Sequence, residues 1–198
     1  MSAGPNDVDK LGPANVGALA ELFEAAACPC YCRYWHFTGN KNEWLDRCAH
    51  RPEENRAELE EAVRLGDAGA RGLVAMENGI AVGWMKLTPR AEVPKLRRLP
   101  VYRSLDLGDE GSTASVGCFL VSPSHRRTGV ARALVTAAEG HARADGVLAL
   151  EAYPRRAAEP LYDEEAWQGP ERVFVERGWT PIHDVGPYPV YRKVLAGL

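Results

Sequence analysis

The chain has 198 residues, of which 45% are hydrophobic and 26% are charged, and its formal net charge at pH 7 is −3. These values indicate a globular protein with one hydrophobic core, so we expect a single domain over residues 1–198. The near-neutral charge argues against a protein that binds nucleic-acid phosphates. No apolar run approaches the ~20 residues of a membrane helix, and the N-terminus lacks the features of a secretory signal. The sequence therefore predicts a cytoplasmic protein with no nucleic-acid and no membrane partner.

The residue pattern in the first third of the chain predicts mainly helices. Residues 1–12 show no apolar periodicity, and we expect them to form a flexible leader. Apolar residues recur at helical spacing from Val16 to Phe23, and Pro29 ends that helix. The alternating Cys28, Cys30 and Cys32 predict an extended stretch. Residues 53–65 form an amphipathic pattern that predicts a surface helix.

The remaining residues alternate between strand and helix patterns. Two strands over 72–76 and 80–87 are joined by Asn78-Gly79, a strong two-residue hairpin signal. A long loop over 89–109 follows, and then a strand over 115–121. A helix over 129–144, a strand over 147–152, a short helix over 170–177 and two closing strands at 179–182 and 190–194 complete the pattern. This order predicts a mixed α/β domain.

The most informative segment runs from Val116 to Val135. A buried strand ends at Pro123, and a short turn with Arg126, Arg127 and Gly129 opens directly into a helix. Backbone N–H groups at a helix N-terminus attract anions, a glycine admits a phosphate to the main chain, and arginines add charge-assisted bonds. The segment matches neither the nucleoside triphosphate loop nor the dinucleotide loop. It predicts a site for another phosphate-bearing molecule.

This segment resembles the signature of the GNAT superfamily of acyl-CoA-dependent N-acetyltransferases. The residues Arg126-Arg127-Thr128-Gly129-Val130-Ala131 are similar to the pattern R/Q-x-x-G-x-G/A, and Gly178-Trp179 is similar to the late glycine-aromatic pair of the family. The resemblance implies a central mixed, mostly antiparallel sheet with helices on both faces. It also implies a splay between the strands at Val116 and Val147 that admits coenzyme A.

The resemblance further implies an enzyme that uses acetyl-CoA as co-substrate and acetylates an amine by direct attack on the thioester. Main-chain groups of the strand end would pair with the pantetheine arm, and one of these amides would hold the oxyanion. The amides at the start of the helix would cradle the pyrophosphate. The implied cofactor-binding residues are Phe119, Leu120, Val121, Arg126, Arg127, Thr128, Gly129, Val130 and Ala131.

Two positions depart from the pattern of the family. A tyrosine that protonates the leaving thiolate is replaced by Phe174, and a glutamate base found in some members falls at Ser115. We therefore take Glu151, on the strand that follows, as the candidate base. Tyr162 is the candidate acid, and Tyr153 is the other nearby hydroxyl. A carboxylate on a strand is equally compatible with a structural ion pair.

The segment from Cys28 to His36 combines thiols and aromatic rings. Three interpretations stay open: buried packing, a zinc site and a redox role. Its spacing differs from the usual zinc pattern, and we expect no metal. Because the family places this region beside the acceptor pocket, the resemblance implies that Tyr31, Tyr34, Trp35 and His36 line the acceptor site.

The expected acceptor is the primary amine of a small molecule. Two alternatives remain, namely a catalytically silent acyl-CoA sensor and a metal or redox module built on the cysteines. A homodimer is possible through the closing strand near Val190.

Overall fold

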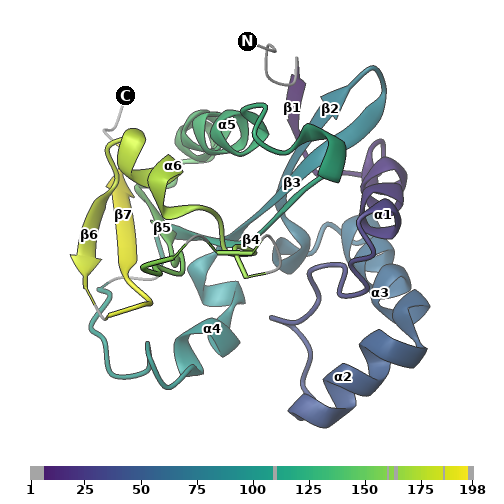
Figure 1. Ribbon diagram of the computed structural model, residues 1–198, viewed down its shortest axis with the longest axis horizontal. Helices are drawn as coiled ribbons and strands as arrows, with labels where there is room; N and C mark the ends of the chain where they lie inside the picture. The colour runs from purple at the N-terminus through teal and green to yellow at the C-terminus, as the bar shows by residue number, and fades with distance from the viewer. Residues whose placement is uncertain (1–6, 109–110, 160, 163–164, 185, 196–198) are drawn as a thin grey trace.

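The computed structural model describes residues 7–108, 111–159, 161–162, 165–184 and 186–195 (Figure 1). A seven-stranded sheet runs through the molecule in the order β1-β2-β3-β4-β5-β7-β6. The strands are β1 (Asp7–Lys10), β2 (Gly72–Glu77), β3 (Ile80–Pro89), β4 (Thr113–Val121), β5 (Ala149–Ala152), β6 (Thr180–His183) and β7 (Val190–Val194). Every neighbouring pair is antiparallel except β4 and β5, which are parallel.

Local sequence signals account for most of the elements. The helices are α1 (Val16–Ala25), α2 (Lys41–His50), α3 (Pro52–Arg64), α4 (Pro94–Arg98), α5 (Val130–Ala144) and α6 (Glu171–Glu176). Asn40 and Glu43 form a reciprocal capping box at the start of α2. Asn78 and Gly79 both have positive φ, as the tight turn between β2 and β3 requires. No helix in the described part of the chain is long and apolar enough to span a membrane.

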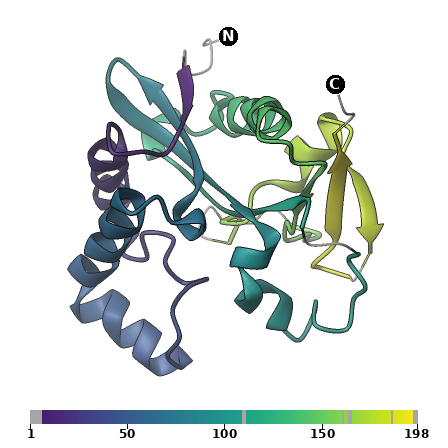
Figure 2. The ribbon, with the colours of Figure 1, turned by 180° about the vertical axis from the view of Figure 1, so that it is seen from behind.

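Helices cover both faces of the sheet, as the resemblance implied. Helices α1, α3 and α4 lie on one face, and α5 and α6 lie on the other (Figures 1 and 2). Each face has its own hydrophobic core. Leu19, Phe23 and Trp84 belong to the core beneath α1 and α3, whereas Leu134 and Phe174 belong to the core beneath α5 and α6.

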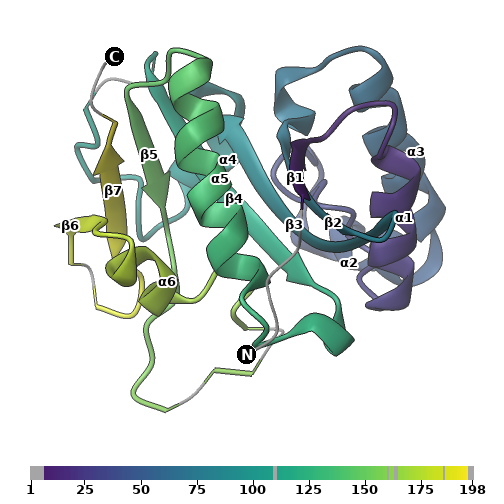
Figure 3. The ribbon, with the colours of Figure 1, turned by 90° about the horizontal axis from the view of Figure 1, so that it is seen from above.

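The sheet opens beside the second half of β4. The register of β4 with β5 runs from Thr113 opposite Ala149 to Val116 opposite Ala152, where β5 ends. Residues 117–121 of β4 therefore extend past β5 and have no strand beside them on that side. Figure 3 shows α5 lying along the sheet over these two strands. The predicted splay between the strands is confirmed.

Residues 7–10 do not belong to the flexible leader that we expected over residues 1–12. Residues 7–10 form β1, which pairs with β2 from Asp7 opposite Met76 to Lys10 opposite Leu73. The short sequence Asp-Val-Asp-Lys has too little apolar content to predict a strand. It forms one because the backbone of β2 supplies its hydrogen-bond partners. Residues 1–6 lie outside the described part of the chain.

Three further expectations are corrected by the structure. The cysteine stretch is not extended, because Tyr31 and Cys32 have positive φ and the segment folds into turns. The expected loop over 89–109 contains the short helix α4. Strand β7 lies between β5 and β6, so the strand near Val190 is not the edge strand at this end of the sheet, and β6 is.

Candidate functional site

A cleft of about 600 Å³ lies where the open end of β4 meets the start of α5. Eight of the nine residues predicted to bind the cofactor line it: Phe119, Leu120, Val121, Arg126, Arg127, Gly129, Val130 and Ala131. The opposite wall comes from Ala166, Pro170 and Val173, next to and within α6. The fold therefore brings the predicted phosphate turn and the predicted strand end into one cavity.

The N-terminus of α5 carries main-chain donors without side-chain caps. Gly129 occupies the cap position with φ +99, and no side chain accepts a hydrogen bond there. The first amide bonded back into the turn is that of Ala133, which donates to the Gly129 carbonyl at 3.0 Å. The first turn of α5 contains no acidic residue, in contrast to α2. This end of the helix favours an anion.

The ninth predicted residue, Thr128, does not line the cleft. Its hydroxyl donates to the carbonyl oxygen of His125 at 2.7 Å, which fixes the turn between β4 and α5. His125 in turn contacts Glu77 at 2.9 Å through its Nε2 atom. Thr128 therefore shapes the turn that presents Gly129.

The charges around the cleft divide into two sets. Arg132 and Arg172 both form ion pairs with Glu176, each at 2.5 Å. Arg127 makes no ion pair with a carboxylate in the described part of the chain, and it adopts a left-handed φ of 63. Its positive charge is therefore available to an anion held at the start of α5.

A segment of the chain lies against the open edge of β4. The amide of Phe119 donates a 2.6 Å hydrogen bond to the carbonyl oxygen of Trp167. Two residues later, Gly169 packs so tightly that an added Cβ would lie 2.6 Å from the Phe119 ring. The Phe119 amide of β4 therefore donates into the splay. An extended ligand lying in the splay would form hydrogen bonds with β4 as a neighbouring strand does.

A family model for the acetyltransferase (GNAT) family matches residues 30–166, which include β4, α5 and the residues that they contribute to the cleft. The chain belongs to the GNAT family. A search of curated proteins finds no match.

Solved GNAT structures share the fold at low sequence identity. An N-acetyltransferase from Staphylococcus aureus Mu50 is 15% identical, with 96% of this chain and 98% of that chain covered and a TM-score of 0.54. PaiA N-acetyltransferase from Thermoplasma acidophilum, solved with coenzyme A, is 10% identical, with 95% and 98% covered and a TM-score of 0.54. YncA from Salmonella typhimurium, solved with acetyl-CoA, is 18% identical, with 96% and 94% covered and a TM-score of 0.53. At these identities the likeness shows the fold.

Glu151, the predicted base of this GNAT chain, is held by other side chains. Its carboxylate is fully buried and accepts hydrogen bonds from Arg90 at 2.7 Å, from Tyr153 at 2.7 Å and from Arg192. Arg90 is also fully buried and donates to the carbonyl oxygen of Leu107. A carboxylate paired with two arginines in the interior is poorly placed to take a proton from a substrate. The geometry favours the structural ion pair over the catalytic role.

Tyr162, the predicted acid, does not line the cleft. It is 77% exposed, and its amide donates to Glu165 at 3.2 Å. Phe174, at the usual position of the tyrosine acid, is fully buried between Phe119 and Trp179. Tyr153 is buried, and its hydroxyl lies 3.3 Å from that of Ser115.

The four residues predicted for the acceptor site separate into two groups. Tyr34 and Trp35 stack edge to face, and the Trp35 indole donates to the Gly117 carbonyl of β4 at 3.3 Å. Tyr31 packs instead against Phe23 of α1, in the core. His36 lies near Gly69, and burial together with the charge of Lys86 lowers the pKa of His36 to about 4.

The cysteines pack against one another and against the sheet. The sulfur atoms of Cys28 and Cys30 lie 3.6 Å apart, and the Trp84 indole donates to Cys32 at 3.1 Å. Burial raises the pKa of Cys32, which favours the inert thiol. Within the described ranges, no group of three or more His, Cys, Asp or Glu residues is placed to hold a metal ion.

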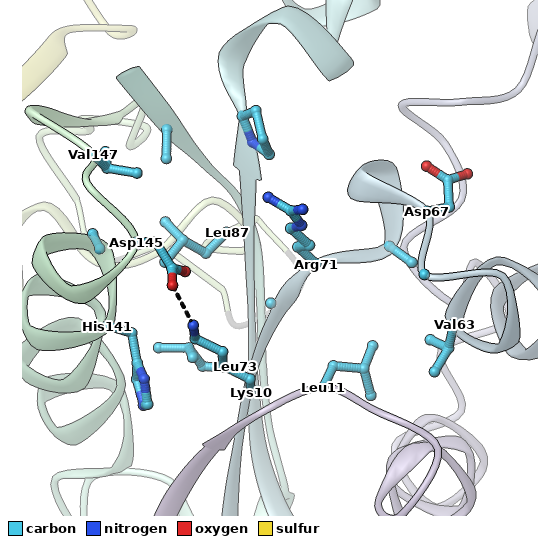
Figure 4. Close-up of a pocket in the computed structure, with 16 residues that line it drawn as sticks. Lys10, Leu11, Val63, Asp67, Arg71, Leu73, Leu87, His141, Asp145 and Val147 are labelled. Atoms are coloured by element: carbon cyan, nitrogen blue, oxygen red, sulfur yellow. Dashed lines mark hydrogen bonds and ion pairs between the residues drawn. The ribbon is translucent and has the colours of Figure 1, made fainter. Parts of the chain in front are cut away.

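A second cavity of about 520 Å³ lies at the other end of α5 (Figure 4). Lys10 and Asp145 form an ion pair of 2.6 Å at its wall, and Arg71 and His141 also line it. None of the residues predicted for the site lines this cavity.

Proposed function

We propose that this GNAT chain is an acetyl-CoA-dependent N-acetyltransferase that acts on a primary amine of a small molecule. The observation that carries the proposal is the cleft in which the uncapped start of α5 meets the open edge of β4. A phosphate-bearing molecule with an extended amide-containing arm needs both features in one cavity.

The residues present fit acetyl-CoA. The amides around Gly129 and the charge of Arg127 would hold the pyrophosphate. Gly129 has no Cβ, and apart from the adjoining backbone no atom lies within 4 Å of the point where a Cβ would stand, which leaves room for the pyrophosphate. The edge of β4 at Phe119 and Val121 would hold the pantetheine arm. The neighbours PaiA and YncA were solved with coenzyme A and acetyl-CoA respectively, which supports this assignment.

The chemistry that follows is direct transfer. The neutral amine attacks the thioester carbonyl, the C–N bond forms, the C–S bond breaks and the thiolate leaves and takes up a proton. The chain contributes proximity and the Phe119 amide as a donor to the carbonyl oxygen. Because Glu151 is tied to Arg90 and Arg192, we assign deprotonation of the amine to solvent.

A catalytically silent acyl-CoA sensor is the second candidate. Phe174 stands where a proton donor is usual, and Tyr162 is exposed outside the cleft. Neither residue is therefore able to protonate the leaving thiolate from its position in the structure. The sensor would bind acetyl-CoA and show no amine-dependent turnover.

The test combines acetyl-CoA calorimetry with a thiol-release assay against a panel of small primary amines. Micromolar binding with thiol release raised by some amines supports the transferase. Binding with no release by any amine, including diamines and aminoalkyl compounds, favours the sensor. No acetyl-CoA binding overturns both.

A further inference from the structure

Four aromatic side chains form a continuous row on the face of the sheet that carries α1 to α4. Ring centroids lie 5.2 Å apart for Phe37 and Trp44, 5.5 Å for Trp44 and Tyr34, and 5.2 Å for Tyr34 and Trp35. Trp35 ends the row on β4, through its hydrogen bond to the Gly117 carbonyl, and lies 5.5 Å from Trp167. The row therefore leads to the place where the Phe119 amide meets the Trp167 carbonyl.

An ammonium group lies over two rings of the row. The Nζ atom of Lys95, which comes from α4, lies 4.0 Å from the centre of the Tyr34 ring and 5.7 Å from that of Phe37. It donates a 3.1 Å hydrogen bond to the Phe37 carbonyl oxygen. Lys95, Tyr34 and Phe37 are each half-buried, so a ligand from solvent can reach the site.

The charge of Lys95 is balanced by rings and a carbonyl. It makes no ion pair with a carboxylate among the residues that the structure describes. The nearby Arg47 lies over Phe37 at 5.6 Å, and its charge is offset by Glu58 at 2.7 Å and Glu54 at 3.3 Å. Two aromatic ring faces and a carbonyl oxygen are the groups that bind an organic ammonium ion in proteins.

We propose that this site binds a second, protonated nitrogen of the acceptor, and that Lys95 occupies it in the free protein. An ammonium held on a ring face has no free lone pair and cannot attack a thioester, so the reacting amine is a different group. The acceptor class is therefore a diamine, a polyamine or an aminoalkyl compound with a second cationic group. This inference rests on the proposed acetyltransferase function for the reaction, but the ammonium site itself does not.

The first arm of the test measures binding without acetyl-CoA. Butylammonium and its uncharged analogue butanol are titrated into the full chain and into Lys95→Ala, with the indole signal of Trp44 followed by NMR. We expect Lys95→Ala to bind butylammonium about tenfold more tightly than the unaltered chain does, with no such gain for butanol. Adding Tyr34→Leu should remove the gain. Equal gains for both probes, or none for butylammonium, overturn the site.

The second arm measures turnover in the unaltered chain. We expect kcat/KM for 1,4-diaminobutane to exceed that for butylamine about tenfold, and Tyr34→Leu to abolish the difference. Equal kcat/KM values for the two amines overturn the acceptor class. Selective butylammonium binding with no turnover for any amine supports the site and overturns the acetyltransferase function, so the two failures are distinguishable.

Discussion

The amide of Phe119 and the carbonyl oxygen of Trp167 are joined by a 2.6 Å hydrogen bond across the open edge of β4. In the proposed complex the same amide faces the carbonyl oxygen of the thioester. Trp167 therefore presents a carbonyl where the substrate would present one, and its segment has to move aside when acetyl-CoA binds.

Trp167→Ala tests this exchange of partners. The substitution removes the contact with Trp35 that holds the segment in place, at a centroid distance of 5.5 Å. Because less contact energy is lost when the segment moves, we expect acetyl-CoA to bind about three- to tenfold more tightly by calorimetry. Weaker binding in this variant would mean that Trp167 supports the bound ligand and does not compete with it.

Gly129→Ala tests the phosphate end of the cleft. A Cβ at φ +99 strains the backbone and projects into the space that the pyrophosphate would fill. We expect the Kd for acetyl-CoA to rise at least about tenfold. Gly140→Ala is the matched control, because Gly140 lies in the interior of the same helix with no atom within 4 Å of an added Cβ. It should leave Kd unchanged and raise stability by about 0.5–1 kcal/mol.

Glu151→Gln separates a structural carboxylate from a catalytic one. The substitution leaves Arg90 and Arg192 without their shared negative partner in the interior. We expect a loss of about 3–5 kcal/mol in the free energy of unfolding, and a Tm lowered by about 10 °C. Turnover per folded molecule should be retained.

Tyr162→Phe is the companion variant for the predicted acid. Since the ring is exposed and lies outside the cleft, both Tm and kcat should match those of the unaltered chain. A large fall in kcat with unchanged Tm, in either this variant or Glu151→Gln, would restore the catalytic role that the structure does not favour.

Because of His36, we predict that the free energy of unfolding decreases as pH falls below 6.5. Burial, followed by the charges of Lys86 and Arg33, lowers the pKa of His36 from 6.5 to about 4. Below pH 6.5 the unfolded chain binds a proton that the folded chain does not bind until about pH 4, so stability falls across this window as pH falls. Because the His36 residue is only partly buried, we expect a loss of about 1–2 kcal/mol.

The variant His36→Gln isolates this contribution. Denaturant unfolding of both proteins between pH 7 and pH 4 gives the free energy of unfolding at each pH. The difference between the two slopes of this free energy against pH is the contribution of the imidazole. The slope should be shallower for His36→Gln. Identical slopes would show that His36 titrates normally in the folded chain.

The phosphate turn could be predicted from sequence because its signals are local. A strand ended by a proline, a glycine with positive φ and an alanine-rich helix follow one another directly between residues 113 and 144, and the structure places them as expected. The hairpin at Asn78 is local for the same reason. These features need no knowledge of distant partners.

Several features that the sequence analysis missed depend on distant partners. Arg90 reaches Glu151 across 61 residues, and the Lys95 ammonium reaches the Phe37 carbonyl across 58 residues. Strand β1 exists because β2, more than 60 residues away, supplies its hydrogen bonds. Neither periodicity nor motif spacing encodes which distant side chain or strand will lie opposite a given residue.

The measurement that tests the account most directly is a titration of acetyl-CoA into isotopically labelled protein, with the main-chain amide signals followed by NMR. We predict saturable changes at micromolar concentration in Phe119 and Val121 of β4, and in Gly129 and Ala131 at the start of α5. The Trp167 segment should shift with them as its carbonyl leaves the Phe119 amide. Changes confined to the cavity around Arg71, or no saturable change in β4 and α5, would contradict the account.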